Sequence, residues 1–389
     1  MSFFNPLGLI PSIISKFIYY VLCLIGLFYS LRRGKNLKHI VYPRSLYRMI
    51  IFGIIMSIFM ASFFQNQSFL ISLIATLPYL FGYITFYILM KLNVPTIKIE
   101  KVIWTFCYIS MGIYIINVIS FPNIIFGTEK EAYDMSRGVI RLGIMLIELI
   151  VLFFFYSINQ WILFKKKVYI LLIFLTALFI VLSVTRQYIL LSFGLGFIFI
   201  LQKASLAKKI AVIVFCFFIY KFVLPQLPMY NAMVELTEAQ AEKNEYDKEY
   251  IRIQAWQFYT YEYQTNSMTA ILGNGVPSLG NSQWGNEFRE AVYPDYGGNG
   301  CFTSDVGWAG FYWNYGLFAT LGLFFLLLKA AFKKKEKKEQ YLSYWCIFII
   351  ITSVASGPII IYYQIISIMT VLYLIYGKEN NGTRHLKLQ

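Results

Sequence analysis

Five arginines in the chain have the chemistry to bind an anionic ligand. A guanidinium group binds phosphate oxygens through two parallel hydrogen bonds and keeps its charge at any working pH. Two of the five stand four residues apart and would share one face of a helix. The five candidates are Arg137, Arg141, Arg186, Arg252 and Arg289. For any one of them the alternative is a surface salt bridge or a side chain that snorkels toward the membrane surface.

The polar stretch around residues 226–305 supplies carboxylates and aromatic rings. Glu262 and Asp305 are candidate general bases, although Asp305 could instead be the N-cap of the helix that follows it. Aromatic faces cover the apolar C–H faces of sugars, while nearby polar groups bind hydroxyls. A carbohydrate site is therefore one reading of this stretch, and a lid anchored by aromatics at the membrane interface is the other. The candidate glycan-binding rings are Trp256, Trp284, Trp308 and Trp313.

Several other chemistries lack their motifs in this sequence. No Asp-x-Asp pair occurs, so a metal-dependent nucleotide-sugar transferase is disfavoured. The phosphate-binding loop, the serine nucleophile elbow and the zinc-protease motif are also missing. The two histidines, His39 and His385, lie in basic segments and do not suit a zinc site. We therefore expect no metal and no cofactor.

The elements that must position these residues are membrane helices. The chain of 389 residues is 58% hydrophobic and 14% charged, with a mean hydropathy of +0.61, whereas a soluble domain carries about 25% charged residues. We predict an all-α polytopic membrane protein with about 11 transmembrane helices, within a range of 10 to 12. The predicted spans are 14–31, 46–64, 68–90, 101–121, 138–160, 168–184, 187–202, 209–225, 306–328, 341–356 and 358–376.

The net charge of +15 gives the predicted orientation. Most lysines and arginines fall in alternate connections, which are 32–48, 91–101, 165–167, 203–209, 329–339 and the tail from 378. By the positive-inside rule these face the cytoplasm, which puts the N-terminus outside and the C-terminus inside. Arg186 then marks an external turn between two separate helices. The excess charge is thereby explained without nucleic acid as a partner.

One connection is much longer than the others. Residues 226–305 form a predicted external loop between helices in 1–225 and helices in 306–389, and a loop of this length is usually functional or structured. Its first part, up to about residue 263, favours one or two short helices. We expect Ile251, Ala255 and Phe258 to pack onto the bundle. Its second part is rich in glycine and asparagine, which favours an irregular coil.

Glu148 is the one acidic residue placed well inside a predicted span. It follows Arg141 by seven residues, which on a continuous helix is about 10 Å deeper in the membrane. An ionisable residue at that depth is a functional candidate. A structural ion pair is the alternative.

Three short stretches resemble a known family. They are Leu272-Gly-Asn-Gly-Val-Pro-Ser278, then Ser304-Asp-Val-Gly-Trp-Ala-Gly-Phe-Tyr-Trp-Asn-Tyr-Gly-Leu317, and the turn Ser183-Val-Thr-Arg-Gln187. The first two look like the loop-to-helix region of bacterial O-antigen and polysaccharide polymerases of the Wzy type. The turn resembles one found in the wider polymerase and O-antigen ligase superfamily. The plan of many spans with one late external loop is also similar.

The resemblance implies a C-type glycosyltransferase fold in the bacterial inner membrane. Such an enzyme polymerises repeat units carried on undecaprenyl pyrophosphate, with lipid-linked glycans as donor and acceptor and a chain-length regulator as an optional partner. It implies that Arg186 binds the donor pyrophosphate, with weaker support for Arg137, Arg141, Arg252 and Arg289. Asp305 or Glu262 would orient or deprotonate the acceptor hydroxyl. An O-antigen ligase and a flippase of lipid-linked oligosaccharide stay open, although the ligases carry a histidine in the large loop that this chain lacks.

Overall fold

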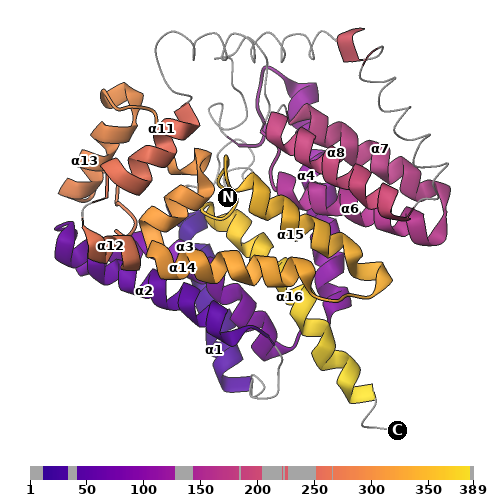
Figure 1. The fold of residues 1–389 in the computed structure, drawn as a ribbon, viewed down its shortest axis with the longest axis horizontal. Coiled ribbons are helices and arrows are strands. Elements are labelled where there is room, and N and C mark those ends of the chain that lie inside the picture. The colour runs from indigo at the N-terminus through magenta and orange to yellow at the C-terminus, as the bar shows by residue number, and fades with distance from the viewer. Residues whose placement is uncertain are drawn as a thin grey trace.

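The computed structural model describes residues 12–33, 42–127, 143–183, 185–203, 221, 224–226, 251–264 and 266–385. Within these ranges the chain forms helices and connecting segments, and no β-strand. The all-α prediction is therefore confirmed for the described part of the chain. Figure 1 shows the helices as one body, with the short helices of the late loop gathered at one end of α14 (Gly307–Phe332).

In the part of the chain that the structure describes, five helices are long and apolar enough to cross a membrane. They are α2 (Arg44–Phe64), α3 (Phe69–Leu92), α4 (Thr96–Ser120), α6 (Ile147–Phe164) and α14. Large apolar side chains stand exposed on these helices, such as Phe63 at 72% and Ile119 at 80%. Exposed apolar surface of this kind favours a lipid environment. The number of crossings and their direction remain predictions.

Other helices among the described residues match further predicted spans. They are α1 (Ser12–Arg33), α7 (Lys167–Leu182), α8 (Arg186–Lys203), α15 (Gln340–Thr352) and α16 (Tyr362–His385). The prediction that α7 and α8 are separate helices is confirmed. At about 1.5 Å per residue the 13 residues of α15 span only about 20 Å, less than the hydrocarbon core of a bilayer. The predicted span 209–225 falls almost wholly outside the described residues.

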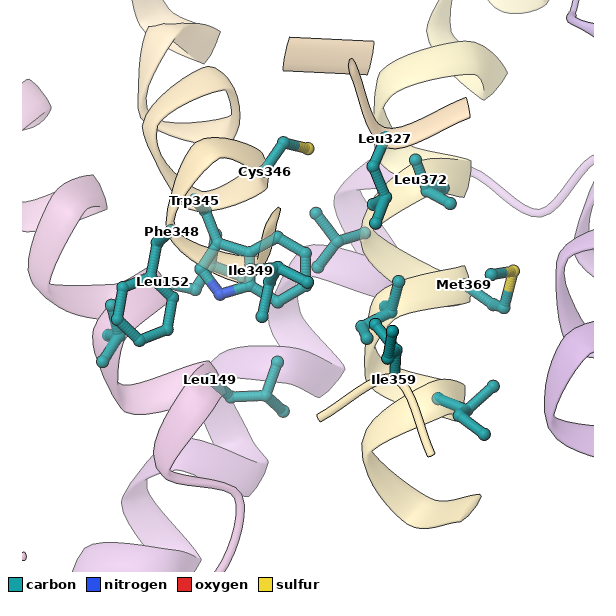
Figure 2. Close-up of a cluster of buried hydrophobic side chains, with 14 of the residues drawn as sticks. Leu149, Leu152, Leu327, Trp345, Cys346, Phe348, Ile349, Ile359, Met369 and Leu372 are labelled. Carbon is teal, nitrogen blue, oxygen red and sulfur yellow. The ribbon is translucent and has the colours of Figure 1, made fainter. Parts of the chain in front are cut away.

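Close helix packing builds the core. Helix α14 lies along α2, α16 lies along α3, and α15 contacts both α14 and α6. A Cβ on Gly53 of α2 would stand 2.7 Å from Cβ of Ala319 on α14, so small residues let these two helices approach closely. Figure 2 shows the side chain of Trp345 on α15 between side chains of α6 and those of α16.

The late loop contains short helices in both of its parts, so the prediction of an irregular coil for the whole second part is wrong over 283–292. They are α11 (Ile251–Gln257), which continues as the π-helical turn η5 (Phe258–Glu262), α12 (Ser267–Leu272) and α13 (Gln283–Val292). Two 3₁₀ turns follow, η6 (Pro294–Tyr296) and η7 (Thr303–Asp305). Ala255 and Phe258 are buried as expected, but Ile251 is 41% exposed, so its predicted packing is wrong.

Candidate active site

Helix α14 is broken at Gly316, and the late loop fills the break. The backbone of Gly316 has φ 79° and ψ 175°. In an unbroken helix the carbonyls of Trp313 and Asn314 would accept from residues four positions later. Here the carbonyl of Trp313 accepts from the Asn274 amide at 2.9 Å, and that of Asn314 accepts from the Gly275 amide at 2.9 Å. The late loop thereby supplies donors for carbonyls at the break.

This junction requires glycine. Gly273 and Gly275 both have φ near +90°, and a Cβ on Gly275 would stand 2.6 Å from Cβ of Ala61. A Cβ on Gly316 would stand 2.3 Å from the carbonyl oxygen of Ile271. Only glycine adopts such backbone angles without strain and permits this approach. The stretches 272–278 and 304–317, which the sequence places apart, therefore interlock through their backbones.

Two glutamines after α2 anchor the junction. Gln65 Nε2 donates to Oδ1 of Asn274 at 2.8 Å. Gln67 Oε1 accepts from the Ser278 amide at 2.9 Å and from the Ser282 hydroxyl at 2.8 Å, and its Nε2 donates to the carbonyl of Val276 at 3.0 Å. Sequence reasoning missed both residues. The sequence feature that could have identified them is a pair of side-chain amides directly after an apolar span.

We call this unit, residues 272–278 with Gly316, Gln65 and Gln67, the Gly316 junction. It fixes the start of α14 and the late loop relative to α2. It therefore supports the candidate site without itself presenting a reactive side chain.

Three of the four candidate tryptophans lie in the protein interior. Trp313 and Trp284 are buried in one aromatic cluster, where the Trp313 ring stacks on Phe288 with centroids 5.1 Å apart. Trp308 is buried and its Nε1 donates to the carbonyl of Ile350 at 2.9 Å. These three rings have a packing role, and sugar binding by them stays a prediction. Trp256 is half-buried.

The non-helical segment 353–361, between α15 and α16, is a meeting point of distant elements. Trp256 Nε1 donates to the carbonyl of Val354 at 2.9 Å. The amide of Gly307 donates to the carbonyl of Ser356 at 3.1 Å. Just before this segment, Gln187 Nε2 donates to the carbonyl of Thr352 at 2.6 Å. Helices α11, α14 and α8 thus all donate hydrogen bonds to carbonyls between residues 352 and 356.

Three candidate residues stand next to these contacts. Arg252 is four residues before Trp256 on α11, hence on the same face of that helix. Arg186 is the first residue of α8 and directly precedes Gln187. Asp305 ends η7, and the residue before it, Ser304, lies against Gly357. All three side chains are half-buried. We call this group with segment 353–361 the convergence site.

The carboxylates flank a buried thiol. Burial, and then the charges of Glu262 and Asp305, raise the pKa of Cys301 to about 11. Glu262 is exposed at the end of η5. The N-cap residue of α14 is Val306, with no side-chain cap, so the N-cap reading of Asp305 is wrong. Both carboxylates are therefore close to Cys301, and Asp305 also adjoins the convergence site.

The other arginines are placed differently. Arg289 lies on α13, with its guanidinium carbon 4.5 Å from the centroid of the Tyr296 ring. No hydrogen bond or ring contact among the described residues links it to the convergence site. Arg137 and Arg141 lie outside the described residues. The contacts at residues 352–357 therefore connect the elements that carry Arg186, Arg252 and Asp305, whereas Arg289 is not connected to them by these contacts.

Comparison of the sequence with protein-family models and with curated proteins finds no match. Membership of the polymerase family therefore stays a prediction that rests on the three motifs. Within the described ranges, no group of three or more histidine, cysteine, aspartate or glutamate residues is placed to hold a metal ion.

The prediction for Glu148 needs a correction. Helix α6 begins at Ile147, after Leu146 in a left-handed conformation with φ 53°. Glu148 is therefore in the first turn of α6 and not about two turns beyond Arg141 on one continuous helix, so the depth derived from Arg141 is wrong. Its burial is confirmed, with 1% of the residue exposed.

Neutral donors surround Glu148. Its Oε1 accepts from the hydroxyl of Tyr188 at 2.7 Å and from Nε2 of Gln364 at 2.6 Å. Its backbone carbonyl accepts from Nε1 of Trp345 at 2.7 Å. Among the described residues it has no salt bridge, and the ion-pair alternative stays open. We call these four residues the Glu148 cluster. It joins α6, α8, α15 and α16, and of its members sequence reasoning had found only Glu148.

Proposed function

We propose that the chain is a membrane glycosyltransferase that polymerises undecaprenyl-pyrophosphate-linked repeat units into O-antigen or a related surface polysaccharide. In this proposal it belongs to the Wzy type and works at the outer face of the bacterial inner membrane. The observation that carries the proposal is the convergence site, where elements bearing Arg186, Arg252 and Asp305 all contact residues 352–357.

The residue types suit a transfer with pyrophosphate as leaving group. The acceptor hydroxyl attacks the anomeric carbon of the donor glycan, a new glycosidic C–O bond forms, and the C–O bond to pyrophosphate breaks. The hydroxyl proton passes to the carboxylate of Asp305. Arg186 and Arg252 stabilise the negative charge that develops on the departing undecaprenyl pyrophosphate. Since guanidinium groups supply this charge, the proposed reaction needs no metal or other cofactor.

The fold also supports a site at this position. Non-helical backbone at membrane depth is tolerated where it is buried in protein or lines a cavity. Segment 353–361 is partly buried in protein, since Ile359 and Ile360 are 0% and 5% exposed, whereas Val354 is 47% exposed.

The test is a reconstituted reaction. Purified protein in liposomes receives lipid-pyrophosphate repeat units, with a chelator present and ATP absent. A ladder of products that differ by one repeat unit is the expected result. Movement of the substrate across the bilayer without new glycosidic bonds would contradict the proposal and indicate a flippase. Transfer of a finished glycan only to a non-polymer acceptor would indicate a ligase.

A further inference from the structure

The first turn of α8, which carries Arg186, is held from two sides. On one side, Gln187 donates to the carbonyl of Thr352 at the end of α15. On the other side, the hydroxyl of Tyr188 donates to Glu148 at the start of α6. Glu148 in turn accepts from Gln364 in the first turn of α16. The position of Arg186 therefore depends on a chain of hydrogen bonds that crosses four helices.

A carboxylate is a costly choice for a purely structural role here. Glu148 is 1% exposed, and its Oε2 has no hydrogen-bond partner among the described residues. Burying a carboxylate without a cation is unfavourable unless other interactions compensate. A single carboxylate oxygen does, however, accept two short hydrogen bonds from different helices, which an apolar side chain could not do.

We propose that Glu148 is the positioning residue that sets the first turn of α8, and through it the guanidinium of Arg186, for the lipid-pyrophosphate donor. The inference rests on the proposed function for its substrate. The placement of the turn by Glu148 does not depend on that function.

Glu148→Ala removes the acceptor of two buried donors, and Glu148→Gln keeps an oxygen in its place. Loss of such an acceptor lowers kcat/KM for the donor by about tenfold to a hundredfold if it moves Arg186. Glu148→Gln restores most of that loss. Ser157→Ala is the matched control, because Ser157 is also buried on α6 but bonds only to the carbonyl of Phe153 within its own helix. It is expected to keep the wild-type value within about twofold.

A double mutant separates positioning from general damage. When Arg186 is already alanine, Glu148→Ala should cost little more, because both changes act through one guanidinium. A role in packing alone predicts that the two losses multiply. Tyr188→Phe, which removes one donor without a cavity, gives a smaller loss of the same kind and serves if Glu148→Ala does not fold.

A second readout needs no substrate. In Thr185→Cys, the rate of labelling by a membrane-impermeant maleimide reports the order of the turn, after subtraction of the rate for the parent protein. Addition of Glu148→Ala should raise this rate at least about fivefold, and addition of Glu148→Gln should not. Unchanged labelling, or wild-type kcat/KM in folded Glu148→Ala, would overturn the inference. If the wild-type protein does not polymerise, the proposed function fails, and the labelling rates alone then support or overturn the placement of the turn.

Discussion

The Gly316 junction and the neighbourhood of the Glu148 cluster differ in how completely their buried polar side chains are paired, although Asn314 Oδ1 and the Tyr315 hydroxyl beside Gly316 also have no hydrogen-bond partner among the described residues. At the junction, Gln67 uses Oε1 for two donors and Nε2 for two acceptors, and Asn274 has partners on both side-chain atoms. Around Glu148, four buried side-chain oxygens have no hydrogen-bond partner among the described residues. They are Glu148 Oε2, Gln187 Oε1, Thr352 Oγ1 and Gln364 Oε1.

The difference indicates a division of labour. A densely paired polar network rigidifies the structure around it, whereas unpaired buried groups in a native protein call for a ligand, a water or a catalytic role as their explanation. The junction therefore acts as a scaffold that fixes α14 and the late loop. Around Glu148, by contrast, unpaired side-chain oxygens remain able to accept hydrogen bonds close to Arg186, where the proposed chemistry occurs.

The largest expected effect is on the scaffold. Gly316→Ala puts a Cβ 2.3 Å from the backbone oxygen of Ile271 at a φ of +79°, so we expect a loss of at least about 3 kcal/mol of stability. Gly112→Ala is the control, since nothing lies within 4 Å of that Cβ in α4, and a gain of up to about 1 kcal/mol is expected. Unfolding in detergent measures both. Equal stability of the two variants would contradict the claim that the junction requires glycine at position 316.

Two glutamines test the comparison directly. Gln67→Ala leaves several buried groups unpaired and should cost about 2 to 3 kcal/mol of stability. Gln364→Ala loses one bond to Glu148 and should cost less stability but more activity in the folded fraction. Unfolding and initial rates on the same preparations check this. A larger loss of stability in Gln364→Ala, or a larger loss of activity in Gln67→Ala, would contradict the division between the junction and the Glu148 cluster.

A smaller effect is expected where α11 reaches the convergence site. Trp256→Phe removes the bond to the carbonyl of Val354 and should cost about 1 kcal/mol. Trp161→Phe is a matched control, since Trp161 is also half-buried and its indole has no hydrogen bond among the described contacts. Both losses come from the same unfolding experiment. If they are equal, the anchoring of α11 is not supported.

The smallest expected effect is on a thiol. The charges of Glu262 and Asp305 help to raise the pKa of Cys301, so Asp305→Asn should lower that pKa and increase the thiolate fraction. Below a pKa of about 11, the rate of alkylation rises about tenfold per pH unit. At pH 9 we expect alkylation of Asp305→Asn to be about twofold to threefold faster than wild type, with Cys301→Ser as background. An unchanged rate would contradict an effect of the Asp305 charge on the pKa of Cys301.

Hydropathy predicted most of the helices, because lipid-facing segments must be long and apolar. It could not predict the break at Gly316, since residues 307–332 are apolar on both sides of it. Nor could it predict that α6 starts at Ile147, because the left-handed Leu146 leaves the apolar pattern unchanged. Both features depend on contacts with residues far away in the sequence.

The sequence was enough to identify the candidate site residues by their type, but it was not enough to predict which elements meet in the fold. Arg186, Arg252 and Asp305 were identified from charge and motif, and the structure adds that their elements meet at segment 353–361. The tryptophans show the limit of the pattern, because Trp284 and Trp313 look like a sugar platform in sequence but lie inside an aromatic core. Gln67 and Gln364 carried no chemical signature, since their importance comes only from their partners.

The rate of polymer formation by Arg186→Ala tests the central claim most directly. Arg44→Ala is the matched control, because Arg44 is likewise half-buried and the first residue of its helix, α2. With a lipid-pyrophosphate repeat unit as substrate, we expect Arg186→Ala to lose about a hundredfold to a thousandfold in rate while Arg44→Ala stays within about twofold. Wild-type rates and chain lengths in folded Arg186→Ala would contradict the convergence site as the place of catalysis.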